Sequence, residues 1–134
     1  MKYLGIDFGE KHVGISVSND DGTMAFPQAT LMGGAGLIDD VLSIVSEKKV
    51  SEIVIGESKN FEGQDNPIMK KARLFAEELA DKAGMPVHFE PEFMTSVEAR
   101  HIQGGGEKTH ASAAALILKS FLDRKVSEAE QQKI

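Results

Sequence analysis

Cysteine and tryptophan are absent from the 134 residues of this chain, and only one tyrosine is present. Because there is no cysteine, the protein has no disulfide framework and no thiolate metal site, so any bound metal is held by oxygen or imidazole. Mg²⁺ and Mn²⁺ are the hard cations that such ligands favour. The sequence also lacks an apolar run of about 18 residues and an apolar secretory leader. We therefore expect a cytoplasmic protein.

Basic residues are in the minority: 15 Lys and Arg stand against 21 Asp and Glu, for a net charge of −6. This balance argues against broad nonspecific binding to nucleic acid, which depends on cations that neutralise phosphates, but it leaves room for a local basic face. Clustered carboxylates repel one another until a cation neutralises them, so part of the acidic excess suits a metal site. The length indicates one domain with a real hydrophobic core.

Apolar runs of strand length, punctuated by glycine, come first in the chain, and helices alternate with strands after them. The predicted strands are residues 2–8, 11–18, 23–31, 52–56 and 86–90. Four helices are predicted. The first carries an apolar stripe from Leu37 to Val45, and the second has Asn66 as its N-cap, Pro67 as its first residue and Gly84 as its end. The third is a short helix at 95–104, and the last helix covers 109–124.

This order predicts an α/β fold in which a mixed five-stranded sheet carries helices on both faces, because the crossover helices must bury their apolar stripes against it. Three antiparallel strands followed by alternating helices and strands are the order of an RNase H-like core. We expect residues 1–125 to form a single domain and the tail 126–134 to fray.

Asp7 ends the first predicted strand and lies between Gly5 and Gly9. Glycines at these positions let another backbone or a phosphate come close, which suits a divalent cation that holds a phosphate. The alternative is a tight hairpin in which Asp7 only caps the turn. Both interpretations fit these residues.

Three more residues lie where the ends of strands one, four and five and the start of the last helix should meet. Glu57 follows a buried strand, Glu92 comes two residues after Glu90 beside a proline that bends the chain, and His110 opens the last helix. A helix N-terminus disfavours the imidazolium form, so a neutral His110 could ligate a metal. The alternatives are a solvated loop acid for Glu57, a surface acid for Glu92 and a surface histidine for His110.

The chain resembles the YqgF family, also called RuvX, from Tyr3 to about Asp123. This is a family of Holliday-junction resolvases and ribosomal RNA processing nucleases, related to the RuvC resolvase and built on an RNase H-like fold. The matching segments are 4–14 (LGIDFGEKHVG), 55–56 with Asn60 and Gly63, 73–79 (RLFAEEL), Glu92 with Thr95, 113–118 (AAALIL) and 120–122 (SFL). The resemblance implies that residues 1–125 form a nuclease domain that hydrolyses phosphodiesters in pre-16S rRNA 5′-end processing or in Holliday-junction resolution.

By this resemblance the acidic triad of the family falls on Asp7, on Glu92 and on the position of His110. The sequence departs from the family at three places. This chain has Pro91-Glu92-Phe93 where the family usually has Asp-Glu-Arg. After Gly56 it has Glu57-Ser58 where the family has Leu-Pro, and it has His110 where the family has Asp. Either Glu57 and His110 rebuild a site closer to RuvC-type resolvases, or the site is an eroded, inactive remnant.

The implied mechanism uses two cations, Mg²⁺ or Mn²⁺, about 4 Å apart. Asp7 would be the bridging ligand, Glu92 and Glu57 the flanking ligands, and His110 a ligand or a proton shuttle. Replacing an aspartate by neutral histidine removes a negative charge, so we expect Mn²⁺ to be preferred to Mg²⁺.

Nucleic acid would be held by basic residues that flank the site. Lys11 and His12 follow the first strand, and Lys70 and Arg73 lie early on the second helix. The alternative interpretation is that these residues form a solvated helix face, and this interpretation suits Lys71 better than Lys70 or Arg73.

A noncatalytic nucleic-acid or ribosome-associated module on the same fold is the competing function. An actin-like ATPase would need two phosphate loops in two domains. The sequence leaves open whether the substrate is RNA or four-way DNA, and a homodimer is required only for the second.

Overall fold

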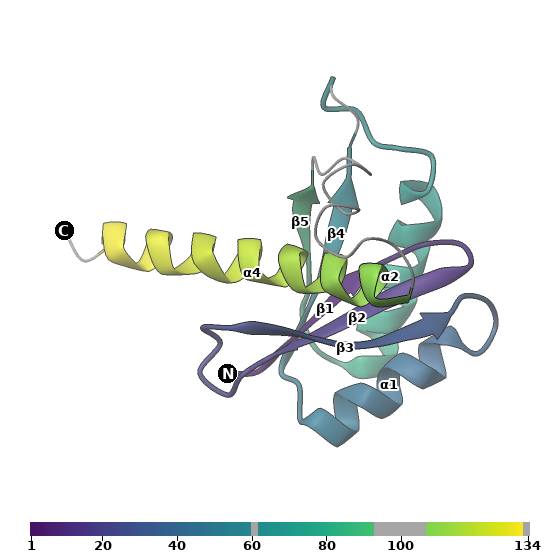
Figure 1. The fold of residues 1–134 in the computed structure, drawn as a ribbon, viewed down its shortest axis with the longest axis horizontal. Helices are drawn as coiled ribbons and strands as arrows, with labels where there is room; N and C mark the ends of the chain where they lie inside the picture. The colour runs from purple at the N-terminus through teal and green to yellow at the C-terminus, as the bar shows by residue number, and fades with distance from the viewer. Residues whose placement is uncertain (60–61, 93–106, 133–134) are drawn as a thin grey trace.

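The computed structural model describes residues 1–59, 62–92 and 107–132 as a mixed sheet with helices on both faces (Figure 1). The strands are β1 (Tyr3–Asp7), β2 (His12–Ser18), β3 (Ala25–Met32), β4 (Glu52–Ser58) and β5 (Val87–Glu92). The helices are α1 (Leu37–Lys48), α2 (Met69–Ala83) and α4 (Glu107–Gln132). The predicted α/β fold class is confirmed.

The strands follow the order β3-β2-β1-β4-β5 in one five-stranded sheet. β1 and β2 are antiparallel, with Asp7 opposite Gly14, and β2 and β3 are antiparallel as well. β1, β4 and β5 run parallel to one another, so their carboxyl ends lie at the same edge of the sheet. The prediction that these strand ends meet at one edge is therefore confirmed.

Two hydrophobic clusters lie on opposite faces of the sheet because side chains alternate along each strand. Leu4 and Ile6 of β1 pack with Phe75 and Leu79 of α2 and with residues of α1. Tyr3 and Val54 pack instead with α4, against side chains that include Leu118 and Phe121. Side chains two or four residues apart in a strand point to the same face. Asp7 therefore lies on the α4 face, as Tyr3 and Gly5 do.

The second helix begins later than predicted. Asn66 does not cap it: its side-chain amide donates to the Ser58 hydroxyl at 2.7 Å, and the backbone carbonyl of Asn66 accepts from Met69 N–H at 2.9 Å. A turn over Asn66 and Pro67 therefore precedes α2. The predicted stop at Gly84 is confirmed, since Gly84 ends the helix with φ 66°, a left-handed conformation that suits glycine.

Strands β4 and β5 each end two residues later than predicted. Pro91 does not bend the chain away, because it lies inside β5, where it pairs with Glu57 of β4. β5 is an edge strand, so the N–H that proline lacks needs no second partner. Glu57 and Glu92 are consequently strand residues instead of loop residues.

Helix α4 extends to Gln132 and so continues through most of the tail that was expected to fray. Residues 126–132 contain neither glycine nor proline and consist largely of good helix formers. Figure 1 shows this end of α4 projecting beyond the sheet. The short helix predicted at 95–104, with Thr95 as its cap, lies outside the described residues. In the described part of the chain, every helix is too short or too polar to cross a bilayer.

Candidate active site at the end of the first strand

Asp7 is the last residue of β1 and is partly buried. Burial raises the pKa of this carboxyl from 3.8 to about 6. Residues directly opposite in an antiparallel pair point to the same face, so Asp7 shares the α4 face with its partner Gly14. Among the described residues, its carboxylate has no hydrogen-bond or ion-pair partner. Asp7 is thus a desolvated carboxylate with no counter-charge in the described part of the chain.

Helix α4 lies directly on β1 and β2 because the strands present small residues to it. A Cβ at Gly14 would overlap the carbonyl oxygen of His110, and one at Gly5 would lie 2.9 Å from the carbonyl oxygen of Ala114. The Ser16 hydroxyl donates to that same Ala114 carbonyl at 2.8 Å. The first turn of α4 is therefore placed against Gly14, the residue opposite Asp7.

The first turn of α4 places His110 over the β1–β2 strand pair, and the ring of His12 lies beside it. Gly14 contacts the backbone carbonyl of His110 and is the register partner of Asp7, so His110 and Asp7 both belong to the α4 face of this strand pair. The rings of His12 and His110 are stacked, with centroids 5.1 Å apart and planes inclined by 22°. The interaction between the two histidines was not predicted, because it joins the start of β2 to a helix at the other end of the chain.

Glu92 ends β5 opposite Ser58 of β4, at the same edge as the carboxyl end of β1. Only its backbone position is described. Glu90, two residues earlier, is buried, accepts from the Ser120 hydroxyl at 3.0 Å and forms an ion pair with Arg124. Sequence reasoning gave Glu90 no role, and its spacing from Glu92 was the one available signal. Glu90 anchors α4 to β5 and has no free oxygen comparable to that of Asp7.

Glu57 lies on the opposite face of the sheet from Asp7, facing α2. Its carboxylate accepts from Arg73 at 3.0 Å and lies 3.4 Å from the Lys59 ammonium. Arg73 and Lys59 also bind Asp65, at 2.9 and 3.0 Å, and these hydrogen bonds lower the pKa of Asp65. The guanidinium of Arg73 further lies 5.1 Å from the ring centre of Phe89. The structure therefore pairs Glu57 and Arg73 with each other and does not bring Glu57 together with Asp7.

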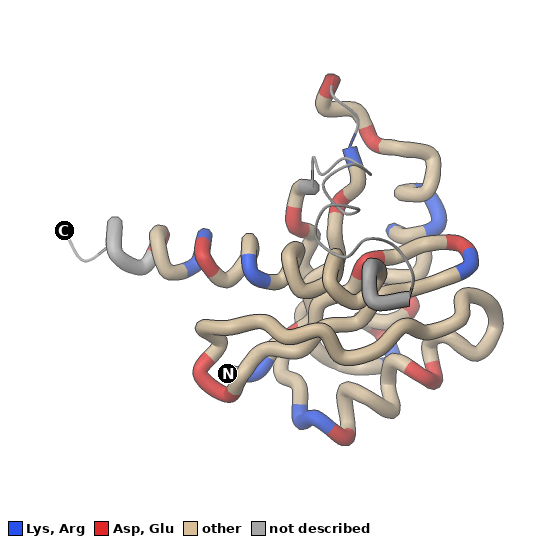
Figure 2. Tube along the Cα trace, in the orientation of Figure 1, with Lys and Arg blue, Asp and Glu red and all other residues tan. Residues whose placement is uncertain are grey.

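The other predicted phosphate ligands are exposed lysines at the same edge. Lys11 lies in the turn between β1 and β2, and Lys70 lies at the start of α2. Within the described ranges neither lysine forms an ion pair, whereas Lys71 binds Glu10 and thereby lowers the pKa of that carboxyl. In the view of Figure 2, blue and red segments are interspersed. Lys11 and Lys70 are thus exposed lysines without an ion-pair partner among the described residues.

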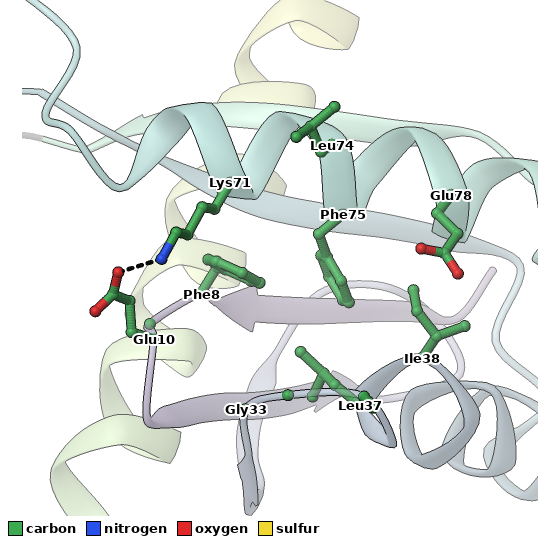
Figure 3. A pocket seen from close by; sticks show the side chains of 12 residues that line it. Phe8, Glu10, Gly33, Leu37, Ile38, Lys71, Leu74, Phe75 and Glu78 are labelled. Carbon is green, nitrogen blue, oxygen red and sulfur yellow. Dashed lines mark hydrogen bonds and ion pairs between the residues drawn. The ribbon is translucent and has the colours of Figure 1, made fainter.

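A cavity of about 400 Å³ lies behind the site, on the α1 and α2 face. Phe8, the residue after Asp7, points into it, and its ring centre lies 5.0 Å from that of Phe75 (Figure 3). The ion pair between Glu10 and Lys71 lies at one end of this cavity. Asp7 and Phe8 therefore lie on opposite faces of the sheet. Asp7 faces α4, and Phe8 points into the cavity on the α1 and α2 face.

The donor set at the site fits a divalent cation in part. Asp7 supplies a carboxylate that lacks a counter-charge, and a nearby cation would offset the cost of its burial. His110 supplies an imidazole, a ligand that Mn²⁺ accepts more readily than Mg²⁺ does. The described residues contain no group of three His, Asp or Glu side chains that could hold a metal.

Taken together, the parallel strands β1, β4 and β5, a buried acid at the end of β1 and a helix that crosses β1 and β2 define an RNase H-like domain. The model of the RuvX family, described as Holliday junction resolvase, matches residues 1–124. The chain belongs to this family, a nuclease family related to the Holliday junction resolvases, and the resemblance predicted from its motifs is confirmed.

Curated relatives support the assignment along the whole chain. A protein of Nitratidesulfovibrio vulgaris, provisionally named a pre-16S rRNA nuclease, is 32% identical over 133 residues, covering 92% of this chain and 94% of the relative. A protein of Oenococcus oeni with the same provisional name is 34% identical over 139 residues, covering 93% of this chain and 96% of the relative.

Solved structures support the fold. RuvC of T. thermophilus, in complex with a Holliday junction substrate, has a TM-score of 0.62 at 19% identity and covers 94% of this chain and 96% of its own. The fowlpox virus resolvase, in complex with Holliday junction DNA, has a TM-score of 0.54 at 9% identity and covers 92% of this chain and 98% of its own. At these identities the likeness establishes a common RNase H-like fold.

Proposed function

We propose that the protein is a metal-dependent endonuclease that hydrolyses phosphodiester bonds of precursor 16S rRNA. The observation that carries the proposal is Asp7, a buried carboxylate with a pKa of about 6 and no partner among the described residues, at the edge where three parallel strands end. A buried charge is costly unless it is paired, so an unpaired one at a sheet edge is poised to receive a cation. The provisional names of the curated relatives favour the ribosomal substrate.

Asp7, Glu92 and His110 are the residues that would hold the metal. When bound, divalent cations at this edge would activate the attacking water and stabilise charge on the departing 3′ oxygen. Asp7 contributes the negative charge on the α4 face, and Glu92 stands two strands away at the end of β5. His110 would contribute an imidazole, either as a metal ligand through a ring nitrogen lone pair or, in its protonated form, as the group that passes a proton to the leaving oxygen. Glu57 holds Arg73 instead of a metal in this scheme.

The phosphate backbone of the substrate would be held by Lys11 and Lys70. Both are exposed and free of ion pairs within the described residues, and they come from the β1–β2 turn and from α2, which flank the site edge. Arg73 contributes less than predicted, because its guanidinium is already occupied by Glu57 and Asp65. Two such lysines on an acidic protein support modest binding that falls with salt.

A noncatalytic nucleic-acid module is the second candidate function. The observation that favours it is that the described residues contain no group of three His, Asp or Glu side chains that could hold a metal. In this scheme the fold and the lysines are retained, and Asp7 is the remnant of a site.

Single-turnover cleavage distinguishes the two. Labelled precursor 16S rRNA and a labelled four-way DNA junction are incubated with the wild type and with Asp7→Asn, in Mg²⁺ and in Mn²⁺. Asp39→Asn, a change to an exposed acid on α1, is the matched control. The proposal expects RNA cleavage that is faster in Mn²⁺, lost in Asp7→Asn and kept in Asp39→Asn. Cleavage of the DNA junction but not of the RNA would mean that the substrate is four-way DNA. Binding of RNA or DNA without cleavage would favour the noncatalytic module.

A further inference from the structure

The stacked pair of His12 and His110 has a role that the proposed function does not use. We infer that His12 is a positioning residue, whose ring holds the imidazole of His110 in one plane at the site. This inference rests on the proposed function, in which His110 ligates metal or transfers a proton. It replaces the predicted role of His12 as a direct phosphate ligand.

His12 presents its ring from a fixed backbone. It is the first residue of β2 and pairs in register with Met32 of β3. Alternation along β2 assigns His12 to the same face as Gly14 and Ser16, both of which contact α4. The ring of His12 therefore extends along α4 at its first turn, although it is exposed to solvent.

His110 is fixed at its backbone, and its side chain makes no hydrogen bond or ion pair with another described residue. Its carbonyl lies against Gly14, which leaves no room for a shift of α4 toward the strand. In the described part of the chain, no hydrogen bond to either ring nitrogen of His110 is found, so the ring contact with His12, with centroids 5.1 Å apart, is what restrains it. Its imidazole would otherwise rotate about two side-chain bonds.

Stacking matters here because both nitrogens of an imidazole lie in the plane of its ring. Fixing that plane fixes the directions in which the nitrogens can donate or accept, which is what a ligand or a proton carrier requires. An offset aromatic pair of this kind favours the held orientation about 3- to 10-fold over the free ones. A phenyl ring at position 12 would stack equally well, whereas it could not bind a phosphate.

The experiment compares His12→Ala with His12→Phe in the full chain. The positioning role predicts that His12→Ala lowers kcat about 3- to 10-fold with KM for RNA unchanged, and that His12→Phe recovers most of the loss. If His12 binds phosphate, both variants raise KM, and that result overturns the inference. Equal kcat and KM in all three proteins overturn it too.

A second readout does not depend on cleavage. The ring C–H resonances of His110, assigned by comparison with His110→Gln, are shifted by the ring current of an aromatic neighbour. The shift should persist in His12→Phe and disappear in His12→Ala; its persistence in His12→Ala would show that His12 does not hold the ring. A protein that cleaves nothing but shows this pattern would contradict the nuclease proposal while the contact between the two rings stands.

Discussion

On the α1 and α2 face of the sheet, the acid at the end of β4 has cationic partners, whereas on the α4 face Asp7 at the end of β1 has none among the described residues. Glu57 is held by Arg73 and Lys59, and Glu10 in the turn after β1 is held by Lys71. Asp7 instead lies beside small residues, with its pKa raised to about 6 by burial. The same kind of residue at the same edge thus stabilises the fold on one face and is available for chemistry on the other.

The largest expected effect comes from removing the charge on the α4 face. Asp7→Asn keeps the size of the side chain, so it should lower cleavage of the RNA about 10³-fold, since metal assistance contributes several kcal/mol to such reactions. Rate constants under single-turnover conditions measure this, with urea unfolding to verify that the variant is folded. If the cleavage rate fell by less than about tenfold, Asp7 would not be essential for cleavage, and the proposed difference between the two faces would be wrong.

The close contact between Gly14 and α4 can be broken next. Gly14→Ala places a methyl group against the His110 carbonyl, so we expect unfolding to become easier by about 2 to 3 kcal/mol and His110 to be displaced. The matched control is Gly36→Ser, because Gly36 is the N-cap of α1, has φ −88° and open space around it. Urea denaturation compares the two; equal stability of both variants would show that α4 does not depend on this contact.

The protonation of Asp7 predicts a specific pH dependence in the metal-free protein. Its folded pKa, about 6, lies above the ordinary value of 3.8, so the folded state holds the proton more tightly. Stability from this group is complete below pH 4 and is lost as the pH rises through 6. Asp7→Asn has no carboxyl to titrate here, so at pH 7 to 8 its free energy of unfolding should exceed that of the wild type by about 3 kcal/mol.

Urea denaturation in EDTA across pH 4 to 8 measures the difference between these two proteins. A difference that does not change with pH would mean that Asp7 is not desolvated in the folded protein.

The smallest effect is expected on the other face. Glu57→Gln should leave cleavage within about twofold and reduce the free energy of unfolding by less than about 1 kcal/mol, because Arg73 is partly exposed and Lys59 and Asp65 remain paired. The same cleavage and urea assays measure both quantities. If Glu57→Gln were as inactive as Asp7→Asn, Glu57 would be a metal ligand and the contrast between the faces would be wrong.

The sequence sufficed to predict the fold class, the edge at which strands end and the place of Asp7, because apolar periodicity and glycine turns are local signals. It did not suffice for Glu57. Once β4 continues to Ser58, alternation within the strand turns Glu57 toward α2, and the partner that receives it there, Arg73, lies on a different element. The stacking of His12 on His110 and the burial of Glu90 against Arg124 join distant segments and leave no local signal.

A Mn²⁺ titration shows whether the carboxylate of Asp7, which has no partner among the described residues, is a metal ligand. Electron paramagnetic resonance follows free Mn²⁺ as the wild type, Asp7→Asn and Glu57→Gln are added in the absence of nucleic acid at pH 7.5. The account predicts binding by the wild type and Glu57→Gln and at least tenfold weaker binding by Asp7→Asn, about 1.4 kcal/mol. Equal binding by the wild type and Asp7→Asn would contradict it.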